Sequence, residues 1–274
     1  MESFQIIYPS SLLTPYVKQY WFLSVDNIER GIQRMIPSGS AYLVFNRGQT
    51  IYSSGNDCMS FGGYLAGQRT AFIDIYFGKL DLIMVIFQPI AARIFFNIPI
   101  DELEEKNIEI SLLGDSLLKE LNERLKNEYN NIECIHLIEQ FFFKRLHLFN
   151  DYNYKRLATA IQDFQKGESD IPRLADSTCL GYKQFKRIFA EYAGINPKSF
   201  IQINRFSKAL YYLQSQPLLS LNDLAYKCGY YDKSHLIKDI KQYSGYTPRE
   251  FLQISDPYSE YKSLFQTFFV ELKQ

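Results

Sequence analysis

The feature of this sequence that most restricts its fold is a helix-ending motif that occurs twice. One copy is AEYAGINPKSF, which ends at Phe200, and the other is KQYSGYTPREF, which ends at Phe251. Both have the spacing Tyr-x-Gly-x-x-Pro-x-x-Phe, and the matching residues are 51 positions apart. A glycine at the end of helical periodicity is typical of a left-handed C-cap, and a proline soon afterwards suits the first turn of a new helix. The repeat therefore predicts two similar helical units, with Gly194 and Gly245 as caps.

The segments before these endings each contain two short helical patterns around a tight turn. They are DIPRLADSTCLGYKQFKRIFAEYAG and LSLNDLAYKCGYYDKSHLIKDIKQYSG. Between them, NPKSFIQINRFSKALYYLQ is predicted to form one longer helix. Its apolar residues recur at helical spacing and predict a buried stripe of Phe200, Ile203, Phe206, Leu210 and Leu213. The predicted layout is a helix pair, a long helix and a second helix pair.

Each pair has the residue types that a helix-turn-helix unit requires. The first helix needs a small residue where the two helices cross, and Ala175 and Ala225 are placed for this. The turn needs a residue that accepts positive φ, which suits Gly229, whereas the first copy has Cys179 there at a modest conformational cost. The second helices have apolar anchors on one face, namely Phe185, Ile188 and Phe189 in the first copy and Leu236 and Ile240 in the second.

Charge is distributed unevenly along a chain whose formal net charge is zero. Residues 166–251 contain 13 Lys and Arg against 8 Asp and Glu, while the remainder of the 274 residues contains 17 basic and 22 acidic side chains. A basic segment attached to an acidic remainder indicates a polyanionic partner for that segment.

The front of the chain has strand patterns followed by helical ones. Residues 40–46, 71–77 and 80–87 are short apolar runs separated by glycine-containing turns, which favours a small barrel or sandwich. From about residue 108 leucines recur at helical spacing: Leu112, Leu113, Leu117, Leu118, Leu121 and Leu125. A second helix, with Ile135, Ile138, Phe142 and Leu146 on one side, follows a break near Asn130, and a third ends at Gly167.

Residues 171–251 resemble the tandem helix-turn-helix DNA-binding domain of the AraC/XylS family of bacterial transcription regulators. The strongest match is LSLNDLAYKCGYYDKSHLIKDIKQYSGYTPREF, and the front of the chain is similar, more loosely, to the β-rich sensor domains of that family, in PSGSAYLVFNRG and FQPIAARIFF. The chain departs from the family pattern at Cys179, Leu236, Lys238 and Ile240, which leaves base preference open.

The resemblance implies an α+β protein with the following organisation. Residues 1–150 form a small β-barrel or cupin-like sensor or dimerisation domain with helices, and residues 151–170 form a connecting helix. Residues 171–252 form the all-α domain with two helix-turn-helix units joined by a long helix, and residues 253–274 form a C-terminal tail.

The resemblance also assigns DNA contacts. The N-terminal residues of each second helix should face base edges in a major groove: Lys183, Gln184, Lys186 and Arg187 in the first unit, and Lys233, Ser234, His235 and Lys238 in the second. The alternative for each of these lysines is a contact with phosphate alone. Lys198, Thr247 and Arg249 flank the docking surface as phosphate candidates. Arg205 is either a further contact or a structural ion-pair residue.

The β-rich part lacks the signature of a metalloenzyme. The three histidines, His136, His147 and His235, all lie outside it, so we expect no metal centre there and no cofactor. Tyr42, Phe45, Tyr64, Phe72 and Tyr76 either line a pocket for a small organic effector or fill a dry core. The helical stripes between residues 111 and 149 are either a dimer face or core.

Three classes of function are compatible with these patterns. The first is a transcription regulator that binds double-stranded DNA, with RNA polymerase as a partner if it activates and a homodimer as a further option. The second is an enzyme that carries a DNA-binding module, although Cys58 and Cys134 lie in no recognisable activating sequence. The third is an architectural protein that uses the helices for partner binding.

The sequence also indicates where the protein acts. The four cysteines are widely spaced, which fits reduced thiols in the cytoplasm. The N-terminus does not have the pattern of a signal peptide. The most apolar stretch is interrupted by Asp81, Gln88, Pro89 and Arg93, so we expect no membrane span.

Overall fold

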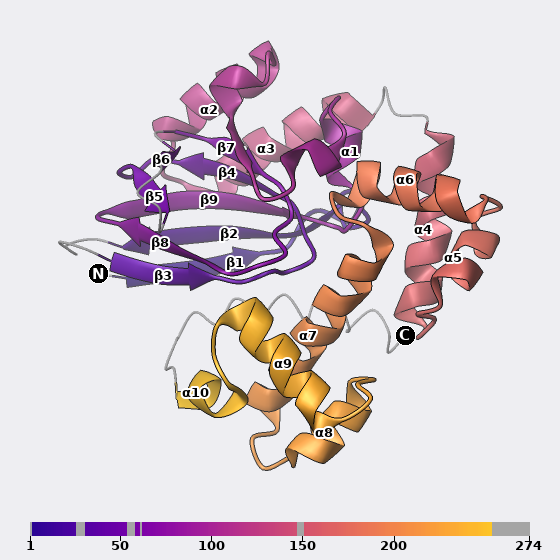
Figure 1. Cartoon of the computed structure of the whole chain (residues 1–274). Coiled ribbons are helices and arrows are strands. Elements are labelled where there is room, and N and C mark those ends of the chain that lie inside the picture. Colours follow the sequence, from indigo (N-terminus) through magenta and orange to yellow (C-terminus); the bar gives the residue numbers. More distant parts are fainter. Residues whose placement is uncertain (1, 26–30, 54–57, 61, 147–150, 254–274) are drawn as a thin grey trace.

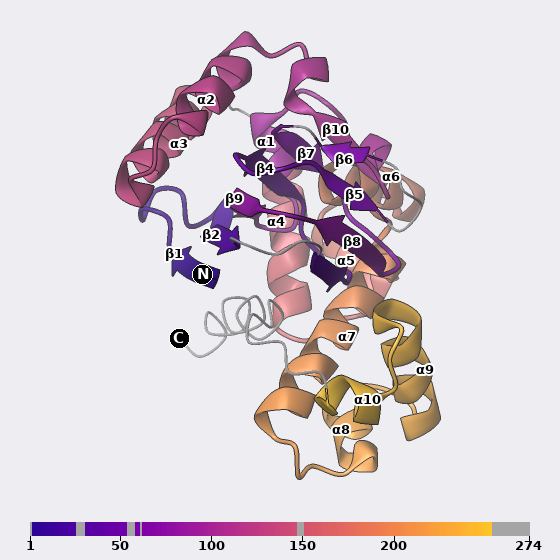
Figure 2. The same cartoon turned by 90° about the vertical axis from the view of Figure 1, so that its left-hand side faces the viewer.

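The chain folds into a β-rich N-terminal part and a helical C-terminal part that pack against each other (Figure 1). The computed structural model describes residues 2–25, 31–53, 58–60, 62–146 and 151–253. Nearly all of the predicted tail, 253–274, therefore lies outside the described residues. Figures 1 and 2 show the helices α4–α6 at one end of the sheets and α7–α10 below them.

Two antiparallel sheets make up the N-terminal part. Within the described residues, one sheet has the strand order β1-β2-β9-β4-β7-β10 and the other has the order β3-β8-β5-β6. The strands are β1 Glu2–Ile7, β2 Val17–Val25, β3 Gly31–Met35, β4 Tyr42–Asn46, β5 Ile51–Ser53, β6 Cys58–Ser60, β7 Tyr64–Ala66, β8 Ile73–Phe77, β9 Leu80–Phe87 and β10 Asn107–Glu109. The α+β class is confirmed, but the sheets do not close on each other, so the expected barrel is better described as an open sandwich.

Strand β9 shows how the apolar runs build two cores at once. It covers the predicted residues 80–87, whereas β4 and β8 each begin two residues later than predicted. Successive side chains of a strand point to opposite faces. Ile83, Val85 and Phe87 therefore pack toward the helices on one face, and Leu82, Met84 and Ile86 pack between the sheets on the other.

Helices α2 (Ser116–Lys126) and α3 (Asn131–Leu146) cover one face of the larger sheet (Figure 2). The predicted break near Asn130 is confirmed, and the buried residues of both helices belong to the same cluster as that face of the sheet. Their apolar stripes are thus core. One part of the predicted leucine stripe was wrong, because Leu112 and Leu117 are 76% and 48% exposed. Leu112 ends the 3-10 turn η2 (Ile110–Leu112), and α2 begins only at Ser116, after Gly114 with φ +68°.

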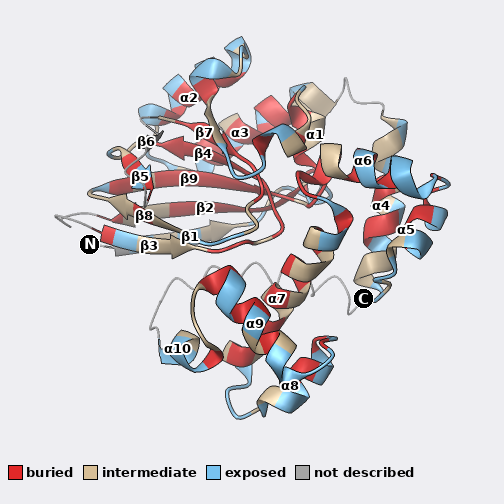
Figure 3. Cartoon of the chain, viewed as in Figure 1, coloured by how far each residue is buried: buried red, intermediate tan, exposed pale blue. Residues whose placement is uncertain are grey.

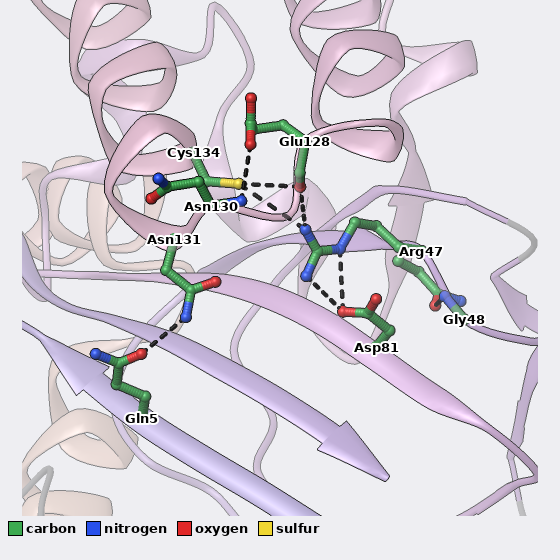
Figure 4. A network of polar contacts seen from close by, with 9 residues as sticks. Gln5, Arg47, Gly48, Asp81, Glu128, Asn130, Asn131 and Cys134 are labelled. Atoms are coloured by element: carbon green, nitrogen blue, oxygen red, sulfur yellow. Dashed lines mark hydrogen bonds and ion pairs between the residues drawn. The ribbon is translucent and has the colours of Figure 1, made fainter. Parts of the chain in front are cut away.

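An arginine network joins this helical pair to the sheet (Figure 4). The guanidinium of Arg47, which follows β4, lies 2.6 Å from the carboxylate of Asp81 on β9. It also donates to the carbonyl oxygen of Glu128, which lies between α2 and α3. The Cys134 thiol donates to the same carbonyl at 3.4 Å. Because three elements share these bonds, the helical pair is held to the sheet by polar contacts as well as by its apolar core.

Helix α4 (Tyr152–Gln165) packs with the helices that follow it. Its buried residues Leu157, Ala160 and Ile161 belong to the hydrophobic cluster of the C-terminal helices. The helix ends before Gly167, as predicted, and that glycine has φ +108°. Asp151 caps its N-terminus, and the Tyr192 hydroxyl donates to the same carboxylate.

We predict that the cysteines differ strongly in reactivity. Cys134 and Cys228 are buried, and burial raises the pKa of each thiol to about 11, so at pH 8 only about one in a thousand is the reactive thiolate. Cys179 is exposed. Iodoacetamide on the native protein at pH 8 should therefore modify Cys179 but not Cys134 or Cys228, as read by mass spectrometry of peptides. Labelling of all three at equal rates without denaturant would contradict the burial.

Candidate nucleic-acid interface

The first helix-turn-helix unit consists of α5 (Ile171–Ser177) and α6 (Tyr182–Ala193). Ala175 is buried at the crossing, and the anchors Phe185, Ile188 and Phe189 are buried in the core. The turn residue Cys179 has φ +55°, which confirms that a non-glycine residue occupies a left-handed position there.

The second unit consists of α8 (Leu221–Lys227) and α9 (Lys233–Ser244). Gly229 has φ +75° in the turn, and Leu236 and Ile240 are fully buried. Both units end on left-handed glycine caps, with φ +83° at Gly194 and φ +75° at Gly245. The predicted origin of the repeated helix ending is thus confirmed.

Helix α7 (Pro197–Ser215) joins the two units through one continuous core. All five residues of its predicted stripe are buried in the cluster that also contains the anchors of both units. Phe251, on the short helix α10 (Pro248–Gln253), packs against that cluster. The two units therefore share one hydrophobic core.

The helices α6 and α9 are called the reading helices here, because they present the predicted base-contacting residues. Figure 3 shows each with a buried side toward the core and an exposed side away from it. Seven of the eight predicted residues are exposed: Lys183, Gln184, Lys186, Arg187, Lys233, Ser234 and Lys238. The eighth, His235, is half-buried. Arg187 forms an ion pair with Glu191 one turn later on α6.

A partly buried polar network supports the second reading helix. The guanidinium of Arg205 on α7 lies 3.2 Å from the carboxylate of Asp239 on α9 and 4.3 Å from the ring centroid of Tyr230. Asp239 Oδ1 in turn lies 3.7 Å from His235 Nε2. Arg205 is therefore a structural ion-pair residue, and its partner Asp239 contacts a predicted base-reading side chain.

The three phosphate candidates have different surroundings. Lys198 and Arg249 are exposed near the starts of α7 and α10. Thr247 is half-buried, and its hydroxyl accepts from the Glu250 N–H while the Glu250 carboxylate accepts from the Thr247 N–H at 2.7 Å. This reciprocal pair is a capping box, so Thr247 has a structural role at the start of α10.

Two tyrosines at the reading helices were missed by the sequence analysis. The intervals between the two units are 50 residues at Ala175 and Cys179 but 51 from the reading helices onward, so the second turn has one extra residue. That residue is Tyr231, which is 93% exposed. Tyr182 lies 51 residues before Lys233, at the start of α6, and its ring centroid lies 5.5 Å from the Lys186 ammonium. The change of interval is the signal that would have revealed Tyr231.

The predicted pocket residues of the N-terminal part do not gather at one site. Tyr42 and Tyr64 line a cavity between the two sheets, called the inter-sheet cavity here, together with Met35, Ile36, Pro37, Ser38, Ser40, Val44, Ala66, Gly67, Arg69, Met84 and Asn107. Phe45 lies in the core on the other face of the sheet, and Phe72 stacks on Arg34. The cavity volume is about 20 Å³, which is room for about one water molecule.

Among the described residues no three His, Cys, Asp or Glu side chains come together as metal ligands. The described helices include none with the length and hydrophobicity needed to span a bilayer.

The fold and the exposed faces of the reading helices define a helix-turn-helix protein with an attached β-rich domain. A family model described as a helix-turn-helix domain matches residues 174–254, and one described as a domain of unknown function matches residues 5–109. The C-terminal helices are therefore similar to helix-turn-helix domains, and the chain is similar to regulators that carry such a domain.

Two curated relatives are transcriptional regulators. The chain is 26% identical over 107 residues to the HTH-type transcriptional activator RhaS of Enterobacter sp. (strain 638), covering 39% of this chain and 38% of that protein. It is 28% identical over 156 residues to an uncharacterized HTH-type transcriptional regulator of Haemophilus influenzae, covering 56% and 52%. The matches thus span about half or less of the length of these relatives.

One solved structure to which the chain aligns is that of ToxT from Vibrio cholerae. It aligns with a TM-score of 0.44 and 12% sequence identity, over 82% of this chain and 97% of that chain.

We predict that Cys179→Gly stabilises the protein. A residue with a Cβ pays about 1 kcal/mol or more in the left-handed region, and glycine does not. The free energy of unfolding from urea titration should rise by about 1 kcal/mol. The matched control is Cys228→Gly, because Cys228 has φ −95° at the C-cap of α8 and is buried, so its replacement should destabilise. A loss of stability in Cys179→Gly would contradict the assigned backbone strain.

Proposed function

We propose that this chain binds specific double-stranded DNA sites through α6 and α9 and regulates transcription in the cytoplasm. The observation that carries the proposal is the repetition, within one core, of two helices whose inner faces are buried and whose outer faces present Lys, Arg, Gln and Ser. The side chains of Lys and Arg match guanine in the major groove, and that of Gln matches adenine. The basic balance of residues 166–251 supports attraction to the phosphate backbone.

The shared core supports recognition by a single chain. Because α7 packs on the anchors of both units, it spaces the two reading helices rigidly. Successive major grooves on one side of DNA lie roughly 34 Å apart. We therefore expect one chain to read a site of two different half-elements without dimer symmetry.

The N-terminal part is proposed to sense a small organic effector. The inter-sheet cavity is its candidate site, because apolar side chains line it together with a few hydroxyl and charged groups. With room for about one water molecule, the cavity must enlarge before an organic molecule can enter. A homodimer, and contact with RNA polymerase in the case of an activator, belong to the same proposal.

The first test is specificity. We expect Arg187→Ala and Lys238→Ala each to weaken specific binding by ~1–3 kcal/mol, because each removes a side chain suited to guanine in a different half-element. Binding-site selection followed by footprinting should show relaxed preference in one half-element for each variant. Loss of preference at the same bases in both variants would disprove the assignment of one reading helix to each half-element.

The second test asks whether the C-terminal helices form an independent DNA-binding module. Residues 151–274 include α4 and every helix of the C-terminal cluster, so this fragment should fold on its own and bind DNA with a salt-dependent affinity. Circular dichroism and a salt series of binding titrations measure both properties. A folded fragment without affinity for any DNA at low salt would leave the helices as a protein-binding module.

A further inference from the structure

Both repeated glycine caps lie against the N-terminal part of the chain. A Cβ built on Gly194 would lie 2.9 Å from Ile100 Cγ2, and one on Gly245 would lie 2.6 Å from Arg34 Nη1. The contact of the first unit is broad, because α6 packs on both α1 (Ala92–Phe95) and the 3-10 helix η1 (Ile100–Leu103). At the end of the second unit the contact is made by Arg34 together with the Phe72 ring, which lies 2.9 Å from the Cβ position built on Gly245.

Arg34, on strand β3, connects the smaller sheet to the end of the second reading helix. Its guanidinium binds Asp74 on β8 through two bonds of 2.6 and 2.7 Å, and its Nη1 donates to the Ser244 carbonyl oxygen at 3.4 Å. It also lies between two rings, with its carbon 4.3 Å from the centroid of Phe72 and 4.5 Å from that of Tyr246. A cation near the C-terminal end of a helix is favoured by the helix dipole. Arg34 therefore holds the last turn of α9 in place.

The segment that begins with Arg34, residues 34–40, has a second face that closes the inter-sheet cavity. Met35, Ile36, Pro37, Ser38 and Ser40 line the cavity. Toward the helices, Ile36 also belongs to the C-terminal hydrophobic cluster, and Gly39, with φ +75°, approaches Asn204 of α7. One short segment thus contacts the cavity on one side and the DNA-binding helices on the other.

Segment 34–40 is the part of the lining of the inter-sheet cavity that is placed so that it can move. Strand β3 is an edge strand of the smaller sheet and pairs only with β8 within the described residues. Beyond Met35 the segment is outside any strand until Tyr42. Its polar links to the sandwich include the Arg34 ion pair with Asp74 at the start of the segment. Further along, the Lys18 ammonium donates to Ser40 Oγ at 2.8 Å and the Tyr42 hydroxyl donates to Ser38 Oγ.

We propose that segment 34–40 couples the inter-sheet cavity to the second reading helix, so that a molecule entering the cavity displaces the segment and frees the end of α9 from Arg34. This inference rests on the proposed function, since it describes how the sensing site would act on DNA binding. The segment acts as a brace, by which we mean that Arg34 fixes the orientation of α9. It does not mask the base-reading residues of α9, because these are exposed or half-buried while the contact is in place. Occupation of the cavity therefore weakens binding to two-element sites.

The experiment uses the full chain and two sets of variants. Tyr246→Ala and Arg34→Ala remove the brace, while Tyr246→Phe keeps the ring on which Arg34 stacks. Ile32→Ala is the control on β3, because Ile32 lies two residues away on the same face and is 62% exposed. Ala66→Leu adds three carbon atoms to a cavity with room for about one water and so imitates a ligand. Ala66→Val is the smaller substitute if the leucine variant does not fold.

Hydrogen exchange at the backbone amides of residues 241–246 is the first readout, and it does not require DNA. We expect Arg34→Ala, Tyr246→Ala and Ala66→Leu to accelerate exchange there about fivefold or more, the size typical of coupling between sites, with Tyr246→Phe and Ile32→Ala close to the parent chain. Unchanged exchange in Ala66→Leu, in a folded protein, would overturn the coupling. Unchanged exchange in Arg34→Ala would contradict the statement that Arg34 holds the last turn of α9 in place.

Affinity for a selected two-element DNA site is the second readout. The three releasing variants should bind it about fivefold or more weakly, whereas a site reduced to the first element should be bound as by the parent chain. Tighter binding by Arg34→Ala would mean that the contact restrains rather than supports DNA binding and would overturn the brace. If the parent chain bound no DNA while exchange responded as expected, the proposed function would fail and the coupling of cavity and helix would stand.

Discussion

The structure depends on two backbone positions at which only glycine fits. Gly194 and Gly245 end the reading helices with positive φ, where a side chain is strained, and the N-terminal part approaches each of them within 3 Å of where a Cβ would lie. The same geometry turns the chain out of each helix and allows the β-rich part to pack against its end. At each site the same glycine is therefore required both for the helix cap and for the close approach of the N-terminal part.

The two helix-turn-helix units share a frame but differ where they would touch DNA. Their anchors, crossing alanines and caps repeat because both must fill the same kind of core around α7. Their outer faces do not repeat: Tyr182 stands at the position of Lys233, and Tyr231 lengthens the second turn. Packing restricts the inner faces, whereas the outer faces are free to differ, as two different half-elements would require.

The N-terminal part is closed in this arrangement. Aromatic content in its strands goes largely into core, since Phe45 packs beneath the helices and Tyr42 and Tyr64 leave a cavity of only about 20 Å³. Phe72, expected at a pocket, stacks instead on Arg34 beside the end of α9. The aromatic residues of this part thus serve packing and the contact with the helices. The sensing proposed for this part would require residues 34–40 to move, because the cavity has room for about one water molecule.

The sequence by itself determined the helical half almost completely, because its signals are local: caps, turn residues and apolar spacing act over four or five neighbouring positions. The strand runs of β4, β8 and β9 were also readable, as was the break before α3. Strands β1, β2 and β3 were not predicted, and neither were the short strands β5, β6, β7 and β10, because a strand of three residues is stabilised by partners far along the chain. Only the tertiary structure decided which residues meet across the two parts, such as Arg34 with Ser244 and Tyr246, since contacts 210 and 212 residues apart leave no local pattern.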